Sequence, residues 1–274
     1  MKSNERKKGE EMKTLVEETK NLNTVSTLEK DLKDLGLKEG MIVLVHSSLS
    51  KIGWVNGGAI AVIQALQNVI TEEGTIVMPG HSSDLSDPSR WGNPPVPVDW
   101  WQEIKDTMPA YDPKITPTSW VGKIPEVFRN FPGVERSAHP SASFTAWGKY
   151  RQKILANHSL DFGLGDESPL ASLYGLDAKV LFIGTTYETN TIFHLGEYRS
   201  RTRKVIQDGA RIMVDGKPKW TAFKELDYQD EEFEKVGKLF EETFHVATGL
   251  IGQAPSKLMS AKEAVDFSQQ YFEQ

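Results

Sequence analysis

Hydrophobic residues in the first third of the chain form two short continuous runs with an amphipathic segment between them. Residues 41–45 and 75–78 are apolar and rich in β-branched side chains, which is typical of buried strands. Residues 57–70 instead repeat apolar side chains at helical spacing, as at Ile60 and Ile63. A strand, a helix and a second strand in this order predict a partly parallel sheet covered by helices.

A further helix is expected before this unit. Leu28, Leu32 and Leu35 fall on one helical face. Ser26 has the side chain and the sequence context of an N-cap in a capping box, and Gly36 is placed to end the helix. We therefore expect an amphipathic helix that begins at Ser26 and packs through its leucines.

The same patterns continue in the second half of the chain. They predict strands at residues 143–147 and 179–183, a hairpin of residues 210–214 and 219–222, and helices at residues 124–130, 229–243, 260–272 and around His194. The fold class is therefore α/β, with a mixed, partly parallel β-sheet flanked by helices.

Residues 80–120 differ from the rest of the chain. They hold seven of the 14 prolines and four of the seven tryptophans, and they contain one expected helix, near residues 99–108. Long irregular segments of compact domains are usually functional or disordered, and the tryptophans argue against disorder. We expect a long Pro- and Trp-rich lid or a wall of a binding site.

The first 22 residues are dominated by charge. Residues 1–20 hold six Lys or Arg and five Asp or Glu, without a clear apolar stripe. We expect residues 1–22 to form a charged N-terminal arm and residues 23–274 to form a single domain.

The composition bounds the function. The chain has 274 residues, of which 38% are hydrophobic and 26% charged, as in a typical globular protein. No apolar run approaches the roughly 20 residues of a membrane span, and no signal peptide is expected. Cysteine is absent, which excludes disulfides, thiolate catalysis and zinc sites with cysteine ligands. We expect a cytoplasmic protein that does not bind membranes.

The net charge of −6 argues against nucleic acid as a partner. Acidic residues concentrate at residues 81–112, 157–188 and 225–245. The first two clusters suit a cationic ligand, because acidic clefts attract cations. We interpret the third cluster as solvated surface.

The segment after the strand at residues 179–183 carries the strongest catalytic candidates. If this segment is helical, His194, Glu197 and Tyr198 share one face. A histidine beside a carboxylate is a common general base near neutral pH. An ordinary surface helix gives the same spacing, so the pattern alone leaves both interpretations open.

Polar residues and glycines follow the strand at residues 41–45. His46, Ser47 and Ser48 come at its carboxyl end, where α/β proteins gather ligands. Residues 53–58 (GWVNGG) precede a helix, and such glycines let backbone amides approach an anion; a structural turn is the alternative. The sequence has neither a Walker loop nor a GxSxG elbow, which disfavours these serines as hydrolase nucleophiles.

Three other features bear on the site. Residues 115–120 and 136–140 are dense in polar side chains, and Arg136 grips an anion, caps a helix or fixes the expected lid. Asp166 and Glu167 suit a cationic substrate, although the same loop reads as the start of a helix. The six histidines show no metal-ligand spacing, so no metal is expected.

Together these segments resemble the aminoglycoside 3-N-acetyltransferase family of antibiotic N-acetyltransferases, whose fold is unrelated to that of the GCN5-type enzymes. The chain looks most like chromosomal members from spore-forming Gram-positive bacteria. The matching motifs run from about residue 26 to the C-terminus: residues 45–50 (VHSSLS), 53–58 (GWVNGG), 85–88 (LSDP) with Trp91, 116–118 (TPT), 136–140 (RSAHP), 143–144 (SF), 168–170 (SPL), 190–191 (NT) and 194–198 (HLGEY).

The resemblance implies acetyl transfer from acetyl-CoA to the 3-amino group of a 2-deoxystreptamine aminoglycoside, and hence antibiotic resistance. It implies direct transfer in a ternary complex, with His194 as general base and Glu197 orienting it or holding the amine. The implied acetyl-CoA contacts are His46, Ser47, Ser48, Gly53, Trp54, Val55, Asn56, Gly57, Gly58, Thr116 and Thr118. The implied contacts to the polycationic amino sugar are Asp87, Trp91, Asp166, Glu167 and Tyr198.

Several alternatives stay open at this point. The carboxylate that pairs with His194 is either Glu197 or, across the fold, Asp166, Glu167 or Glu126. The substrate is an aminoglycoside or another amine. A serine-type thioester or ester hydrolase on the same scaffold, or a non-catalytic binder of acyl-CoA or cationic sugars, are the rival functions. A homodimer is compatible with the sequence.

Overall fold

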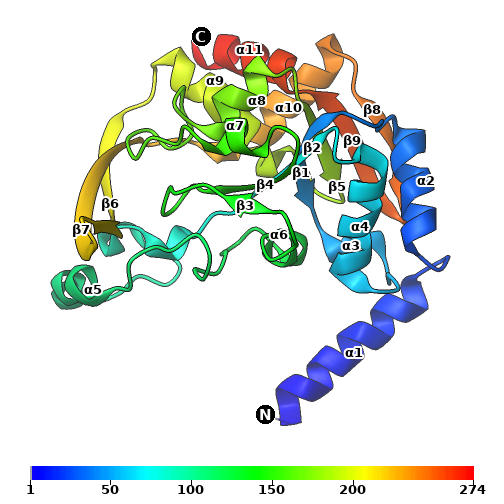
Figure 1. Cartoon of the computed structure of the whole chain (residues 1–274), viewed down its shortest axis with the longest axis horizontal. Helices are drawn as coiled ribbons and strands as arrows, with labels where there is room; N and C mark the ends of the chain where they lie inside the picture. Colours follow the sequence, from blue (N-terminus) through cyan, green and yellow to red (C-terminus); the bar gives the residue numbers. More distant parts are fainter. Residues whose placement is uncertain (1) are drawn as a thin grey trace.

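The computed structural model describes the backbone of residues 2–274 and the side chains of residues 9–10 and 12–274. Its strands are β1 (Ile42–Ser47), β2 (Thr75–Pro79), β3 (Glu135–Arg136), β4 (Phe144–Gly148), β5 (Lys179–Ile183), β6 (Val205–Val214), β7 (Lys217–Leu226), β8 (Ala247–Ile251) and β9 (Ala254–Ser260). Seven of them form one sheet in the order β3-β4-β2-β1-β5-β9-β8, and β6 and β7 form a separate ribbon (Figure 1).

Helices fill the segments between the strands. They are α1 (Lys2–Glu18), α2 (Val25–Leu35), α3 (Leu49–Ile52), α4 (Gly58–Ile70), α5 (Trp101–Thr107), α6 (Lys123–Phe128), α7 (Arg151–Leu155), α8 (Pro169–Gly175), α9 (Ile192–Ser200), α10 (Phe233–Thr243) and α11 (Ala261–Phe272). Short 3₁₀ turns are η1 (Ser83–Leu85), η2 (Pro88–Arg90), η3 (Val98–Trp100), η4 (Tyr187–Thr189) and η5 (Asp230–Glu232).

The centre of the sheet is parallel. Strand β1 pairs in parallel with both β2 and β5, whereas β4 and β9 join on either side in the antiparallel direction. Val43, Leu44 and Val45 of β1 are all fully buried, because helices cover both faces of the sheet. The prediction of a mixed, partly parallel sheet flanked by helices is confirmed.

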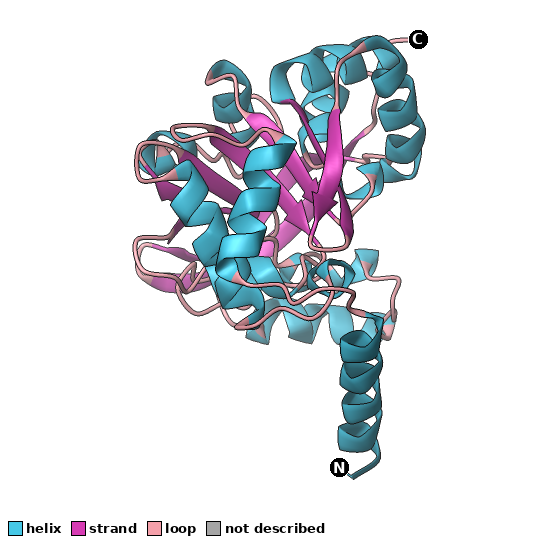
Figure 2. Cartoon of the chain, turned by 90° about the vertical axis from the view of Figure 1, so that its right-hand side faces the viewer, coloured by secondary structure: helices cyan, strands magenta, loops and turns pink. Residues whose placement is uncertain are grey.

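Helices lie on both sides of the sheet (Figure 2), and two apolar cores lie on its opposite faces. One contains Leu28 and Leu32 of α2 and packs them against α4 and one face of β1. The other contains Phe193 of α9, Phe240 of α10 and Val265 of α11. The second core therefore fixes α9, the helix that carries the catalytic candidates.

The helix expected to begin at Ser26 is α2, which begins at Val25 and has its N-cap two residues before Ser26. Thr24 is its N-cap, and its hydroxyl and that of Thr27 form the capping box reciprocally with the two backbone amides. The expected leucine face is buried, and Gly36 ends the helix with a φ of 114°. A Ser26 side chain could cap a helix, but Thr24 is the residue with the extended backbone at the N-cap position.

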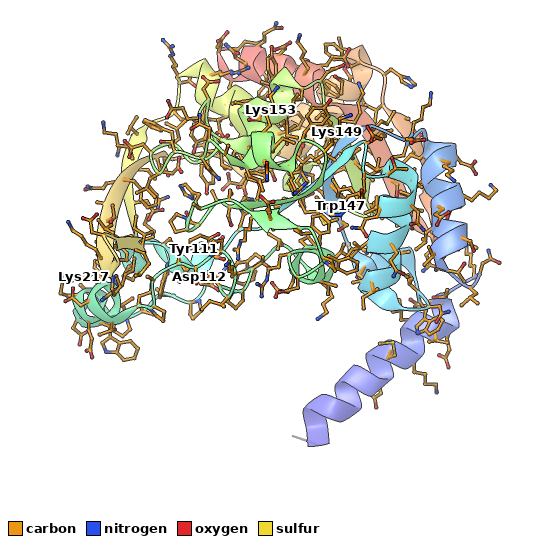
Figure 3. All side chains as sticks on the ribbon, viewed as in Figure 1. Tyr111, Asp112, Trp147, Lys149, Lys153 and Lys217 are labelled. Carbon is orange, nitrogen blue, oxygen red and sulfur yellow. The ribbon has the colours of Figure 1, made fainter. Side chains whose placement is uncertain are left out.

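Residues 80–120 contain η1, η2, η3 and α5 and otherwise lack regular structure. Arg136 holds this segment to the sheet: it donates to Thr116 O at 2.5 Å, to Ser82 Oγ at 2.7 Å and to Gly80 O. Tyr111, labelled in Figure 3, donates its hydroxyl to Ser137 O at 2.8 Å. Of the roles expected for Arg136, fixing this segment is the one that these contacts support.

Helix α1 projects from the rest of the molecule (Figure 1). Its C-terminal end is held where Trp54 N donates to Thr19 Oγ1 at 2.7 Å. None of the helices in residues 2–274 combines the length and the apolar character that crossing a membrane requires. The division into an arm of residues 1–22 and a domain of residues 23–274 stays a prediction.

Candidate active site

A cavity of about 1500 Å³ opens at the carboxyl ends of the parallel strands. His46 and Ser47 end β1, and Ser48 follows them; all three line this cavity. Asn190 and His194 line it from the segment that follows β5. This is the edge of an α/β sheet at which ligands are expected.

Close packing on α11 sets the position of α9. A Cβ atom added to Gly196 would lie 2.1 Å from Ser268 Oγ and 2.7 Å from both Gln269 N and Val265 O. Glycine therefore lets the two helix backbones approach each other. Gly196 therefore serves the packing of α9 on α11.

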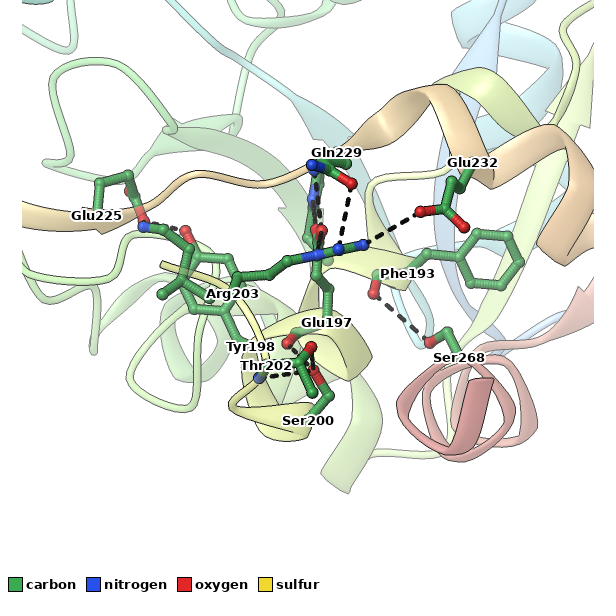
Figure 4. A network of polar contacts seen from close by, with 12 residues as sticks. Phe193, Glu197, Tyr198, Ser200, Thr202, Arg203, Glu225, Gln229, Glu232 and Ser268 are labelled. Carbon is green, nitrogen blue, oxygen red and sulfur yellow. Dashed lines mark hydrogen bonds and ion pairs between the residues drawn. The ribbon is translucent and has the colours of Figure 1, made fainter. Parts of the chain in front are cut away.

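His194 and Glu197 are hydrogen-bonded within α9. Nδ1 of His194 lies 3.1 Å from Oε2 of Glu197. The other carboxylate oxygen, Oε1, accepts from Nε of Arg203 at 2.7 Å and from the backbone N–H of Gln229 at 2.9 Å (Figure 4). Glu197 is thus the carboxylate that pairs with His194. Glu126 instead bonds Arg129 and Thr118.

The surroundings keep Glu197 ionised although it is fully buried. Burial alone raises the pKa of a carboxyl group. The hydrogen bonds from His194, from Gln229 N–H and from Arg203 outweigh this effect, so the pKa of Glu197 lies below its ordinary value. A charged carboxylate then faces Nδ1 of His194, so Nδ1 carries the proton and Nε2 is left as the acceptor.

Aromatic side chains hold the imidazole of His194 on two sides. The ring of Tyr228 lies 4.6 Å and that of Phe233 4.7 Å from its centroid. The side chain of His194 is 10% exposed, and it lines the cavity together with both aromatic residues. Its orientation is therefore fixed by packing as well as by Glu197.

Acidic side chains line the same cavity. They are Asp84, Glu188, Asp208, Glu225 and Asp230. Glu225 is buried, which raises its pKa, and it accepts hydrogen bonds from Tyr198 Oη and from the backbone N–H of Gly163 and Leu226. The interpretation of residues 225–245 as solvated surface is wrong for Glu225, which β7 buries at the cavity. Asp230 is exposed and also lines the cavity.

Uncharged polar side chains line the cavity near the carboxyl ends of β1 and β5. His46 Nε2, Ser47 Oγ and both side-chain polar atoms of Asn190 are buried and have no hydrogen-bond partner among the described residues. Burial lowers the pKa of His46 to about 3, so its imidazole is neutral at pH 7. These residues therefore give the cavity neutral polar groups that are free to bond a ligand.

Residues 53–58, expected at the cofactor, do not line this cavity. They hold the junction between α1 and α2 instead. Asn23 Nδ2 donates to Trp54 O at 3.0 Å, and Asn56 N donates to Asn23 O at 2.9 Å. Gly57, with a φ of 88°, is the N-cap of α4.

Thr116 and Thr118 also lie outside the cavity lining. Thr118 donates its hydroxyl and its backbone N–H to Oε2 of Glu126, at 2.6 and 2.9 Å. Thr116 Oγ1 accepts from Asp112 N at 2.9 Å. Both hydroxyls are therefore used in fixing the wall formed by residues 80–120.

Some of the residues expected at the amino sugar line the cavity and others do not. Trp91 lines the cavity, and its Nε1 donates to Ser86 Oγ at 3.0 Å. Asp87 does not line the cavity; it is paired with Lys105 at 2.6 Å and caps η2. Tyr198 does not line the cavity, but its hydroxyl donates to Glu225, which does.

Asp166 and Glu167 are exposed and lie outside the cavity. Asp166 pairs with Nε of Arg199 at 2.8 Å. The helix start read from the same loop is confirmed, since Ser168 caps α8 and Pro169 is its first residue. Within the described residues, no group of three or more His, Asp or Glu side chains is arranged to hold a metal ion.

The sequence reasoning missed Arg203, Gln229 and Tyr228. Tyr228 and Gln229 lie in a loop that is distant in sequence from α9, and Arg203 lies in the irregular segment that follows α9. No helical or strand spacing therefore relates these residues to His194. The acidic cluster at residues 225–245 was the one signal that pointed to this region.

The chain is similar to known proteins of one family. The chain matches the aminoglycoside 3-N-acetyltransferase family over residues 44–273. It is 53% identical over 262 residues to the SPbeta prophage-derived aminoglycoside N(3')-acetyltransferase-like protein YokD of Bacillus subtilis, covering 95% of this chain and 96% of that protein. It is 31% identical to aminoglycoside N(3)-acetyltransferase IX of Micromonospora chalcea, over 91% and 93% of the two chains.

Solved structures extend the likeness. The crystal structure of YokD superimposes with a TM-score of 0.94, covering 95% of this chain and 97% of that chain. The binary complex of AAC-IIIb with CoASH superimposes with a TM-score of 0.82 at 28% identity, covering 92% and 97%. With its sheet, its cavity and these relatives, the chain belongs to the aminoglycoside 3-N-acetyltransferase family and is an acyltransferase.

Proposed function

We propose that this enzyme transfers the acetyl group of acetyl-CoA to the 3-amino group of a 2-deoxystreptamine aminoglycoside, and that transfer is direct within a ternary complex. The observation that carries the proposal is the bonded pair His194–Glu197 in a cavity that also presents acidic and neutral polar groups. Family membership and a CoASH-bound relative support acetyl-CoA as the cosubstrate.

In this mechanism His194 is the general base. Its Nδ1–H is held by Glu197, so Nε2 takes a proton from the substrate amine as the amine nitrogen attacks the thioester carbon. The C–S bond then breaks, the amide forms, and the CoA thiolate receives the proton. A positioned base of this kind typically contributes about 10²–10⁴-fold to the rate.

The acidic groups of the cavity support a polycationic acceptor. Asp84, Asp208 and Asp230 carry negative charge toward the space that His194 faces. Carboxylates in a cleft raise the local concentration of a cationic substrate and hold its ammonium groups. We place the amino sugar on this side of the cavity.

The neutral polar groups support the acyl donor on the other side. His46, Ser47 and Asn190 have free hydrogen-bonding atoms that suit the amides of pantetheine and the thioester carbonyl, which are themselves uncharged. Lys123, which also lines the cavity, supplies a cation suited to a phosphate.

A serine hydrolase on the same scaffold fits less well. A serine nucleophile needs a base within hydrogen-bond reach, and Ser47 Oγ has no partner among the described residues. Cysteine is absent, so no thiolate exists to carry the acetyl group in a ping-pong route. Direct attack by the amine therefore remains the simpler mechanism.

The test is an assay of thiol release from acetyl-CoA, run with and without each member of a small panel of deoxystreptamine aminoglycosides. We expect release only when an aminoglycoside is present, and a product acetylated at the 3-amino group by mass spectrometry and NMR. Release in water alone would identify a hydrolase. Release only with some other amine would overturn the substrate assignment.

The binder alternative is tested by His194→Ala. We expect this variant to bind CoA as the wild type does while turnover falls by about 10²-fold or more. Unchanged turnover would remove His194 from the mechanism. The cytoplasmic location, the homodimer, the absence of a metal, the role in resistance and the opening of residues 80–120 as a lid remain predictions.

A further inference from the structure

Arg203 connects the His194–Glu197 pair to the segment that leads from β7 into α10. Its Nε donates to Oε1 of Glu197 at 2.7 Å, and its Nη1 donates to Oε1 of Gln229 at 3.2 Å (Figure 4). Its Nη2 lies 3.6 Å from Oε1 of Glu232. One guanidinium thus hydrogen-bonds the buried carboxylate and the side chain of Gln229, and it forms a longer ion pair with Glu232.

The same guanidinium is held from the C-terminal helix as well. Its central carbon lies 4.8 Å from the ring centroid of Phe272. The side chain of Arg203 is 16% exposed and does not line the cavity, so it does not reach a substrate there. Any effect of Arg203 on the reaction must therefore act through Glu197 or through the segment at residues 228–230.

That segment faces the cavity. Gln229 N–H bonds Glu197, Tyr228 packs its ring on His194, and Asp230 lines the cavity on the acidic side. Arg203 bonds the side chain of the middle residue of these three. Its position therefore determines how the general base and the acidic side of the cavity are placed relative to each other.

We propose that Arg203 is a positioning residue for acetyl transfer: it holds the carboxylate of Glu197 in its orientation, and it ties the segment at residues 228–230 to the His194–Glu197 pair. The inference rests on the proposed function of His194 as general base. It adds a residue outside the cavity on which the base depends.

Arg203 is one of several groups that surround the His194–Glu197 pair. Glu225 of β7, Tyr228 of the following loop and Glu232 of η5 surround the pair. His81, in the segment after β2, interacts electrostatically with His194. Helix α11 contributes Ser268 and Phe272. Among the described residues, Arg203 is the one whose permanent positive charge bonds Glu197.

Removing this charge has a defined consequence. Burial then acts on Glu197 with only the two N–H donors to oppose it, so its pKa rises. As the pH falls, Glu197 takes up a proton earlier and no longer holds Nδ1–H of His194 as an anion. The loss of activity in the variant is therefore larger at pH 6 than at pH 8.5.

The test compares Arg203→Met and Arg203→Lys with a matched control, Arg151→Met. Arg151 makes the same Nε to Oε1 bond, at 2.9 Å, to Glu135, and neither residue lines the cavity. We expect kcat to fall about 10- to 100-fold in Arg203→Met, the range found for outer partners of functional histidines. Arg203→Lys keeps the charge, so we expect a smaller loss and a wild-type pH profile. Arg151→Met should be unchanged.

A second measurement separates a positioning role from a purely structural one. Circular dichroism first establishes that each variant is folded at the assay temperature. Guanidinium ion at low millimolar concentration is then added to Arg203→Ala, with sodium chloride at equal ionic strength as the control. Partial recovery of kcat by guanidinium alone supports the proposal. Folded variants with wild-type kcat and an unchanged pH profile would overturn it.

A readout without substrate keeps this test distinct from that of the proposed function. Histidine labelled with ¹⁵N reports the Nδ1–H of His194 by NMR in the free enzyme. We expect that signal to shift in Arg203→Met and to stay in Arg151→Met. A shift without any acetyl transfer by the wild type would sink the proposed function alone. An unshifted signal would sink the role of Arg203 alone.

Discussion

The imidazole of His194 and the carboxylate of Glu197 meet at 3.1 Å from neighbouring turns of α9, yet they face different surroundings. His194 lines the cavity, whereas Glu197 is fully buried behind it. Of the two roles that the family resemblance allowed for Glu197, burial favours orienting the histidine over holding the incoming amine. His194 is thus placed to contact the substrate, and Glu197 is placed to orient the imidazole and hold the proton on its Nδ1.

Replacing Glu197 by Gln keeps the shape of the side chain and removes its charge. We expect kcat to fall at least tenfold, because the amide no longer fixes Nδ1–H of His194 as an anion does. Arg203 then lacks its buried partner, and the protein loses about 3 kcal/mol of stability. Steady-state kinetics and urea unfolding measure the two effects. A variant with wild-type kcat would show that the carboxylate is dispensable.

Gly196 tests how far the packing of α9 controls the site. An alanine Cβ at this position meets Ser268 Oγ and two backbone atoms of α11. We expect Gly196→Ala to cost about 1–3 kcal/mol of stability, as other overpacked cores do, and to lower kcat by shifting His194. Thermal unfolding and kinetics check both points. A more stable and fully active variant, as helix propensity alone predicts, would contradict the close approach of the two helices.

The acidic side of the cavity makes a prediction about salt. Asp84→Asn and Asp230→Asn should each raise KM for an aminoglycoside about two- to fivefold, the effect of an exposed charge pair, and should flatten its dependence on ionic strength. Asp34→Asn is the control, since Asp34 is exposed on α2 and pairs with Lys30. Equal KM values for all three variants and the wild type would mean that these cavity acids do not bind the substrate.

Buried neutral histidines make the fold sensitive to acid. Burial lowers the pKa of His46 to about 3 and that of His139 to about 4. The unfolded chain binds these protons below about pH 6.5 while the folded chain does not, so stability is fully present above pH 6.5 and falls as the pH drops. At pH 5 the loss is about 2 kcal/mol for each histidine.

Thermal unfolding between pH 5 and pH 9 measures this loss. We expect a nearly constant Tm above pH 7 and a decrease of several degrees by pH 5. Glu197, whose pKa is lowered, adds its own loss only below about pH 4.5. A Tm that stays flat down to pH 5 would mean that the histidines are not held neutral in the fold.

Local patterns predicted the elements that are buried on both sides or carry clear caps. The apolar run of β1, the periodicity of α4 and the turn at Asp215 and Gly216 each follow from neighbouring residues alone. Strands β8 and β9 were missed because Gly249 and Pro255 interrupt their apolar pattern. Their pairing with β5 is a tertiary contact that the local sequence does not encode.

For the candidate active site, too, the local sequence did not predict the contacts between distant segments. His194 and Glu197 were predictable because one helix carries both at a fixed spacing. Charge density favoured Asp166 and Glu167, but exposure is decided by the fold, and both lie outside the cavity. Glu225 and Asp230 belong to a cluster interpreted as surface, and only the β6–β7 ribbon and η5 bring them to His194.

The crystal structure of a ternary complex of the wild-type enzyme with CoASH and an aminoglycoside tests the account most directly. The distance to measure joins Nε2 of His194 to the 3-amino nitrogen. We predict about 2.6–3.2 Å, directly or through one water, with the thiol of CoA on the far side of that nitrogen. An aminoglycoside bound with every amine more than about 6 Å from His194 and no bridging water would contradict the assignment of this histidine as the base.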